Sequence, residues 1–165
     1  MISLERWGPG DLPLLQRLLG DPAMMEHLGG PEPEEKIASR QKRYEADPGC
    51  LKIVADGEDL GWVGYWDREW RGEQVHEIGW SVLPAAQGRG VATAATRLAI
   101  EAARETGRHR AIHAFPNVEN APSNAICAKL GFTLLGAQEF EFPPGHAMRC
   151  NDWRLDLGAP RTPTT

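Results

Sequence analysis

The hydrophobic pattern of the chain alternates between two periods. Near the N-terminus, apolar residues recur at helical spacing, with glycine or proline where each run ends. Short apolar runs bounded by turn residues then predict strands. The helical period returns later in one long and one short segment. The predicted helices span residues 11–20, 21–28, 34–46, 88–106 and 120–130, and the predicted strands span 51–55, 60–66, 75–83, 111–115, 132–142 and 148–157.

This order of elements predicts an α+β domain with a mixed sheet. The first three strands follow one another through short turns, at Asp56-Gly57 and over the polar stretch 67–74, which favours an antiparallel meander. A chain of 165 residues is long enough for one domain with a real core. We expect that domain to span residues 1–157 and the tail 158–165 to be disordered.

Composition narrows the classes of function. With a net charge of −5, the chain lacks the basic surface that broad nucleic-acid binding needs. No apolar run reaches the roughly 20 residues of a membrane span, and the N-terminus lacks the pattern of a signal peptide. The three cysteines are far apart and the five histidines are scattered, so we expect reduced thiols, a cytoplasmic protein and no metal site.

The most informative segment runs from Val82 to Ala92, where an apolar strand passes through a glycine loop into a helix. The first amides of a helix have no internal partner, and the helix dipole favours an anion there. Gly88 and Gly90 allow positive φ and a close approach of the backbone, and Arg89 adds charge. The segment therefore predicts a site for an anion such as a diphosphate, although an ordinary strand-to-helix turn has the same outline.

The spacing Gln87-x-x-Gly90-x-Ala92 resembles the acetyl-coenzyme A signature of the GNAT acyltransferases. A second segment, from Asn120 to Phe132, resembles the other hallmark of that family, with Lys129-Leu130-Gly131-Phe132 closing a short helix. By itself this segment is also an ordinary capped helix, with Asn120 as its cap. Both motifs occur in the family's order, and the resemblance covers residues 3–157.

The resemblance implies the GNAT fold, a mixed but mostly antiparallel seven-stranded sheet flanked by helices. It points to the branch that includes ribosomal-protein N-terminal acetyltransferases. It also implies that the backbone of Val82 and Leu83 pairs with the pantetheine arm, that amides from Gly88 to Thr93 hold the diphosphate, and that Asn120 bonds the pantetheine. The expected acetyl-coenzyme A residues are Val82, Leu83, Gln87, Gly88, Arg89, Gly90, Val91, Ala92, Thr93 and Asn120.

The implied reaction is direct attack of an amine on an acetyl thioester. A backbone amide near Ser81 or Val82 is the expected oxyanion donor. Many relatives use a tyrosine as general acid, and the matching position here is Cys127. We expect Ser123, one turn earlier on the same helix face, to take that role, although it could simply satisfy first-turn amides. For Cys127 we expect a buried structural thiol.

A carboxylate must accept the proton of the amine, because a primary amine is mostly protonated at neutral pH. Glu77 is the first candidate, on the strand leading to the thioester, and Glu141 is the second. Glu139 and Glu141 share a face of their strand. His76 is a weaker option, because it falls on the face opposite Glu77. Each acid could instead be a solvated or ion-paired side chain.

The acceptor is less defined by the sequence. Four of the six tryptophans cluster around the middle strands and could line an acceptor pocket or belong to the core: Trp62, Trp66, Trp70 and Trp80. A small-molecule amine or a peptide N-terminus fits as the acceptor, and a homodimer is consistent with the family.

Two other functions stay open, a catalytically silent acyl-coenzyme A binding domain and a dinucleotide-binding oxidoreductase. The late position of the glycine loop in the chain argues against the second.

Overall fold

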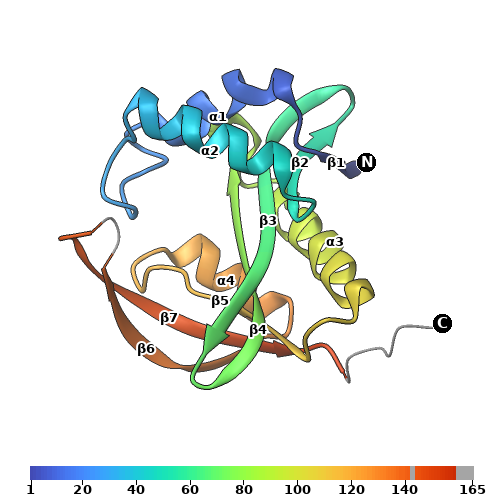
Figure 1. Ribbon diagram of the computed structural model, residues 1–165, viewed down its shortest axis with the longest axis vertical. Coiled ribbons are helices and arrows are strands. Elements are labelled where there is room, and N and C mark those ends of the chain that lie inside the picture. The colour runs from blue at the N-terminus through green and yellow to red at the C-terminus, as the bar shows by residue number, and fades with distance from the viewer. Residues whose placement is uncertain (142–143, 159–165) are drawn as a thin grey trace.

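A single seven-stranded sheet forms the centre of the molecule in a computed structural model that describes residues 1–141 and 144–158 (Figure 1). The strand order is β1-β2-β3-β4-β5-β7-β6, and only the β4–β5 pair is parallel. The predicted mixed, mostly antiparallel sheet is therefore confirmed. The strands are β1 (Ile2–Arg6), β2 (Cys50–Ala55), β3 (Glu58–Trp70), β4 (Glu73–Val82), β5 (Ala111–Ala114), β6 (Thr133–Glu141) and β7 (Ala147–Asp156).

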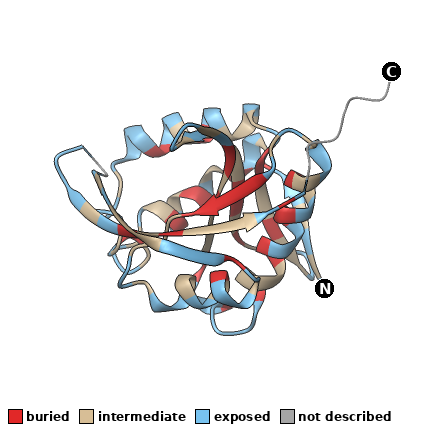
Figure 2. Ribbon diagram, turned by 90° about the horizontal axis from the view of Figure 1, so that it is seen from below, coloured by how far each residue is buried: buried red, intermediate tan, exposed pale blue. Residues whose placement is uncertain are grey.

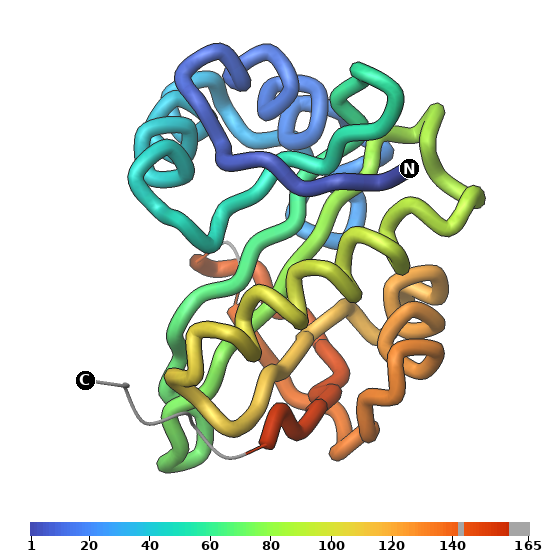
Figure 3. The backbone as a smooth tube through the Cα atoms, turned by 90° about the vertical axis from the view of Figure 1, so that its right-hand side faces the viewer, coloured from blue at the N-terminus to red at the C-terminus, as the bar shows by residue number. Residues whose placement is uncertain are grey.

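Four α-helices flank the sheet. The first two, α1 (Leu12–Leu19) and α2 (Glu34–Ala46), lie together at one end of the molecule, and α3 (Val91–Thr106) crosses in front of the strands in Figure 3. The short α4 (Ala121–Lys129) lies between β5 and β6 in sequence. Two 3₁₀ turns, at Pro9–Asp11 and Pro84–Ala86, precede α1 and the α3 loop.

Two hydrophobic clusters hold the helices to opposite faces of the sheet. The larger packs the small-residue face of α3, including Ala95 and Ala99, on central strand residues such as Val63 and Ile78. The smaller places Trp7 and the leucines of α1 beside Ile37 of α2. In Figure 2 the buried residues follow the middle strands and the helix surfaces turned toward them. We call these the α3 face and the α1–α2 face of the sheet.

The β3–β4 hairpin is longer than the sequence indicates. We expected a polar turn over 67–74, but pairing continues to Trp70 and Glu73, and the turn is only Arg71-Gly72. Both turn residues have positive φ, of 51° and 79°, which matches the right-handed twist of the strands. The polar residues of 67–70 therefore lie on a strand, because ladder hydrogen bonds and the packing of alternate side chains outweigh their weak strand propensity.

Three further predictions need correction. Residues 2–6 form an edge strand paired with β2, which the sequence analysis missed, since its alternation is short. The segment 21–28 forms consecutive turns rather than a helix, with Asp21 Oδ1 accepting from the amides of Ala23 and Met24. The long helix begins at Val91 rather than residue 88, because Gly90 is left-handed with φ 75°.

Strands β4 and β5 run side by side only briefly. Their pairing is limited to His76 with Ile112 and Glu77 with His113. Beyond Glu77, β4 continues to Val82 beside β3 alone, whereas β5 ends at Ala114. The two strands therefore diverge, and one edge of β4 from Ile78 onward has no strand partner among the described residues.

None of the helices in the described part of the chain has the length and apolar content to cross a membrane. The tail expected to be disordered lies outside the described residues except for Gly158.

Candidate functional site

The loop before α3 has the backbone expected of an anion site. Gly88 and Gly90 have φ of 76° and 75°, and no atom within 4 Å meets a Cβ built on either glycine. The N-cap of α3 is Gly90, no side chain caps this end, and the first turn has no acidic residue. The amides of Val91, Ala92 and Thr93 therefore begin a 16-residue helix with donors and partial positive charge directed out of the protein.

Two side chains predicted for cofactor binding also brace the loop itself. Gln87 Nε2 donates to the carbonyl of Val82 at 2.9 Å and contacts Met24 Sδ at 3.5 Å. Arg89 donates to the carbonyl of Ala85 at 2.6 Å, and its side chain is exposed. These bonds direct the side chains of Gln87 and Arg89 toward the carbonyls of Val82 and Ala85. The two side chains are therefore held by the chain that precedes Gly88 and Gly90.

The two strand residues predicted to pair with pantetheine have different orientations. The amide of Leu83 donates to the carbonyl of Leu60 at 2.9 Å, so the backbone of Leu83 faces β3. Because successive residues of a strand direct their backbone groups to opposite edges, Val82 and Trp80 face the diverging side toward β5. The structure thus places the backbone of Val82 on the edge that faces the opening and that of Leu83 on the edge paired with β3, and Trp80 shares the edge of Val82.

Helix α4 starts and ends as its motif predicts. Asn120 caps the helix by accepting from the amide of Ser123 at 3.2 Å, and Gly131 follows it with φ 88°. Ser123 is half-buried in the first turn. Cys127 is completely buried in the α3-face core, and burial raises the pKa of its thiol to about 12. Such a thiol is protonated and inert, as expected of a structural cysteine.

Asn124 is a structural anchor of α4 that sequence reasoning did not single out. Its amide nitrogen donates to the carbonyls of Asn117 and Asn120, and its oxygen accepts from Asn151 and Trp153 of β7. These four bonds tie the first turn of α4, and with it Ser123, to the sheet.

Glu77 is the more secluded of the two carboxylates predicted as bases. It lies on the α1–α2 face of β4, where its side chain is 17% exposed and paired with Arg68 of β3. Burial raises the pKa of Glu77, while the Arg68 guanidinium and the nearby His113 oppose that shift. The carboxylate of Glu77 is thus a stronger base than a carboxylate in water. The guanidinium of Arg68 favours its ionised form.

The Arg68 guanidinium lies in an aromatic cluster formed by three distant segments. Its central carbon is 5.0 Å from the ring centre of Trp70, 4.8 Å from that of Phe115 and 5.4 Å from that of Phe140. Cation–π attraction therefore adds to the ion pair with Glu77. Arg68 was not predicted, because the sequence pattern indicates a turn there. The spacing of two residues from Trp66 to Arg68 and on to Trp70, which is typical of one strand face, was the available signal.

A second buried pair, His113 and Asp152, holds one ring of the Arg68 aromatic cluster in place. His113 Nδ1 lies 2.6 Å from Asp152 Oδ1, and both side chains are almost completely buried. Asp152 also accepts from the indole nitrogen of Trp70 at 3.0 Å. This network fixes Trp70, one wall of the Arg68 cluster, to β7.

The predicted tryptophan cluster is split between the two faces of the sheet. Trp62 and Trp66 stack at 6.2 Å on the α1–α2 face, above the paired glycines Gly64 and Gly79, whose missing side chains leave room for the rings. Trp80 instead packs against the core on the α3 face.

The remaining candidate bases lie elsewhere. Glu141 is exposed in the β6–β7 hairpin and accepts from the amide of Gly145 at 2.5 Å. Its register partner is Ala147, so the structure does not bring Glu141 together with Glu77. His76 lies on the α3 face, as predicted, and burial lowers its pKa to about 4.

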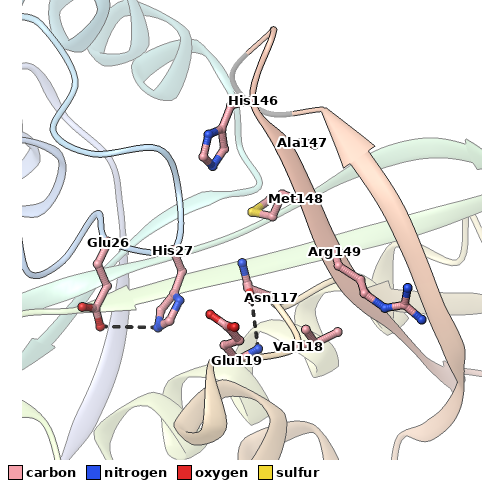
Figure 4. Close-up of a pocket in the computed structure, with 9 residues that line it drawn as sticks. All are labelled: Glu26, His27, Asn117, Val118, Glu119, His146, Ala147, Met148 and Arg149. Atoms are coloured by element: carbon pink, nitrogen blue, oxygen red, sulfur yellow. Dashed lines mark hydrogen bonds and ion pairs between the residues drawn. The ribbon is translucent and has the colours of Figure 1, made fainter.

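A polar cavity of about 290 Å³ opens between three segments that are distant in sequence. Figure 4 shows Glu26 and His27 from the turns after α1, Asn117 to Glu119 from the β5–α4 connection, and His146 to Arg149 from the β6–β7 hairpin. Both signs of charge line it: Glu26 lies 3.4 Å from His27, and Arg149 is paired with Glu139 of the same hairpin. One side of the cavity, Asn117 to Glu119, belongs to the connection that follows β5.

Comparison with known proteins agrees with this geometry. The model of the acetyltransferase (GNAT) domain matches residues 2–133. An acetyltransferase from Salmonella typhimurium, solved with its cofactor acetyl-CoA, is 21% identical with a TM-score of 0.74, covering 100% of this chain and 99% of its own. Spermidine N-acetyltransferase from Vibrio cholerae, in complex with CoA and spermine, is 18% identical with a TM-score of 0.77, covering 94% and 95%.

A third structure comes from the branch that the sequence resembles. Ribosomal-protein-alanine N-acetyltransferase from Brucella melitensis is 21% identical, with a TM-score of 0.75, and the match covers 93% of this chain and 99% of that one. These likenesses show the fold, and the family model covers most of the chain. The protein therefore belongs to the GNAT family of acetyltransferases, enzymes whose acetyl donor is acetyl-coenzyme A.

Proposed function

We propose that this protein transfers the acetyl group of acetyl-coenzyme A directly to the primary amine of a polar acceptor, a small molecule or a peptide N-terminus. One observation carries the proposal: a secluded carboxylate, Glu77, lies on the strand that leads to the uncapped N-terminus of α3. When bound, acetyl-coenzyme A supplies the acetyl group as a reactive thioester.

The residues around the α3 loop fit this donor. Amides from Gly88 to Thr93 would hold the diphosphate, and the exposed Arg89 would add positive charge. The free edge of β4 at Trp80 and Val82 would pair with the extended pantetheine arm as an added strand, and Asn120 would bond it from α4. An amide on this edge would also serve as the oxyanion donor.

Glu77 is our choice for the general base. Its raised pKa suits removal of a proton from an ammonium group, and Arg68 keeps the carboxylate ionised and oriented. Glu141 is the weaker choice, because its carboxylate accepts a hydrogen bond at an exposed hairpin.

Ser123 is our choice for the general acid. Its amide is committed to Asn120, while no hydrogen bond of its hydroxyl is formed with the described residues. The hydroxyl Oγ is thus available to give up a proton. It lies in the first turn of α4, which Asn124 anchors to the sheet.

The polar cavity of Figure 4 supports a polar acceptor. Glu26 and Glu119 suit an ammonium group. The buried, unpaired thiols Cys50, Cys127 and Cys150 support action in a reducing compartment such as the cytoplasm.

The experiment is to follow free thiol released from acetyl-coenzyme A against a panel of amines, amino acids and short peptides, with thermal stabilisation by coenzyme A measured in parallel. Stabilisation together with turnover on one amine class is the expected result. Stabilisation without turnover on any acceptor would favour a silent acyl-coenzyme A binding domain and overturn the catalytic proposal.

A further inference from the structure

Two of the histidines that are scattered in sequence meet on the α3 face of the sheet, together with an aspartate. Asp67 on β3 is the direct cross-strand partner of His76 on β4. His109, in the connection between α3 and β5, lies with its Nε2 2.8 Å from Asp67 Oδ1. Its ring centre is 4.6 Å from that of His76. One possible ligand atom from each of the three side chains lies within 4.8 Å of the others.

The chemistry of this group is that of a transition-metal site. Two imidazoles and one carboxylate are a donor set that Zn²⁺ and similar ions accept, with water completing the coordination. His76 is completely buried, and its Nδ1 has no hydrogen-bond partner among the described residues. A buried nitrogen without a partner is costly in a folded protein unless something else satisfies it.

The position of the group separates it from acetyl transfer. His76 and Glu77 are neighbours in sequence, but alternation places them on opposite faces of β4. Enzymes of this family need no metal for their reaction. An ion at this point would instead connect β3, β4 and the segment after α3. His76, the ligand on β4, also belongs to one of the two residue pairs that join β4 to β5.

We propose that Asp67, His76 and His109 bind a divalent transition-metal ion such as Zn²⁺, with a role in stabilising the fold. Arg108 competes for the same site, because its guanidinium forms an ion pair with Asp67. Metal binding would displace this guanidinium, whose side chain is half exposed and can turn into solvent.

The test uses Co²⁺, whose visible absorption reports its ligands, and Zn²⁺ as competitor, with the full-length protein. The expected result is binding of one Co²⁺ per chain, its displacement by Zn²⁺, and a higher melting temperature with Zn²⁺. His109→Gln and Asp67→Asn, at residues outside the buried core, should each weaken binding at least about tenfold, since even changes to supporting residues cost that much.

Two variants make the test specific. Arg108→Gln should bind Co²⁺ more tightly than the wild type, because it removes the competing cation without removing a ligand. His146→Gln, on the exposed hairpin, should bind as the wild type does. No Co²⁺ binding by the wild type, or binding that His109→Gln and Asp67→Asn leave unchanged, would overturn the proposal.

Discussion

The surroundings of Glu77 are the basis for proposing it as the general base. On the strand surface its carboxylate is removed from most solvent, and one guanidinium compensates its charge. Replacing it by glutamine keeps the shape but removes the proton acceptor. We expect Glu77→Gln to lower turnover by about 10²- to 10⁴-fold, the usual contribution of a general base, with coenzyme A affinity unchanged.

Thiol release and calorimetric titration of coenzyme A together check this prediction. Glu139→Gln is a suitable control, because Glu139 is exposed on β6 and, among the described residues, forms an ion pair with Arg149 alone. Loss of turnover in Glu141→Gln rather than in Glu77→Gln would move the base to the hairpin.

Arg68 opposes the effect of burial on Glu77, which leads to a prediction about pH. Burial raises the pKa of Glu77, and the guanidinium lowers it again. The protonated carboxyl is inactive as a base, so activity is lost as pH falls through this pKa. In Arg68→Met the pKa rises further, and the acid limb of the kcat/KM profile should move to higher pH. A limb that stays in place, or moves to lower pH, would contradict the role of Arg68.

Ser123 is predicted to act through its hydroxyl rather than its backbone. In Ser123→Ala the amide can still donate to Asn120, so the helix cap is retained. We expect kcat to fall with little change in coenzyme A affinity. Ser39→Ala, exposed on α2, is the matched control. Full activity of the Ser123 variant would end its assignment as general acid.

At the scale of elements, the β3–β4 pair carries the site, and its close approach depends on glycine. A Cβ on Gly61 would lie 2.2 Å from the carbonyl oxygen of Ser81, a backbone atom of the paired strand. We expect Gly61→Ala to lower the free energy of unfolding by about 1–3 kcal/mol, because the strands must move apart. Chemical denaturation measures this change.

Gly10→Ala provides the comparison, since no atom lies within 4 Å of a Cβ built there. That variant should change the free energy of unfolding little. Equal stability of the two variants would show that the strands can separate at Gly61 without cost.

Elements with strong local signals were predictable from the sequence. Gly107 and Gly131 mark helix ends because they adopt the left-handed conformation that other residues avoid, whereas Gly20 ends α1 in a right-handed conformation. The predicted range of α2, 34–46, matches the structure. By contrast, the extension of β3 to Trp70 depends on pairing with β4 and on contacts with Phe115, directly after β5, and Phe140 of β6. Local patterns carry no information about such partners.

For the whole molecule, the resemblance carried by the two family motifs was enough to predict the sheet, and the loop before α3 has the positive-φ glycines that its sequence predicts. The residues that complete the candidate site could not be predicted in the same way. Arg68 meets Phe115 and Phe140 only after β3, β5 and β6 are assembled, and His113 finds Asp152 across the β5–β7 pair. Their roles follow from contacts between residues far apart in sequence, not from spacing along the chain.

The proposed function depends first on whether the α3 N-terminus holds the diphosphate of acetyl-coenzyme A. The most direct measurement is calorimetric titration of coenzyme A into the wild type, Gly90→Asp and Gly72→Asp. Both glycines have positive φ, of 75° and 79°, and open space at the Cβ position, so backbone strain is matched. We predict that the wild type and Gly72→Asp bind coenzyme A alike, whereas Gly90→Asp loses binding through charge repulsion at the loop. Unchanged affinity in Gly90→Asp would contradict the account.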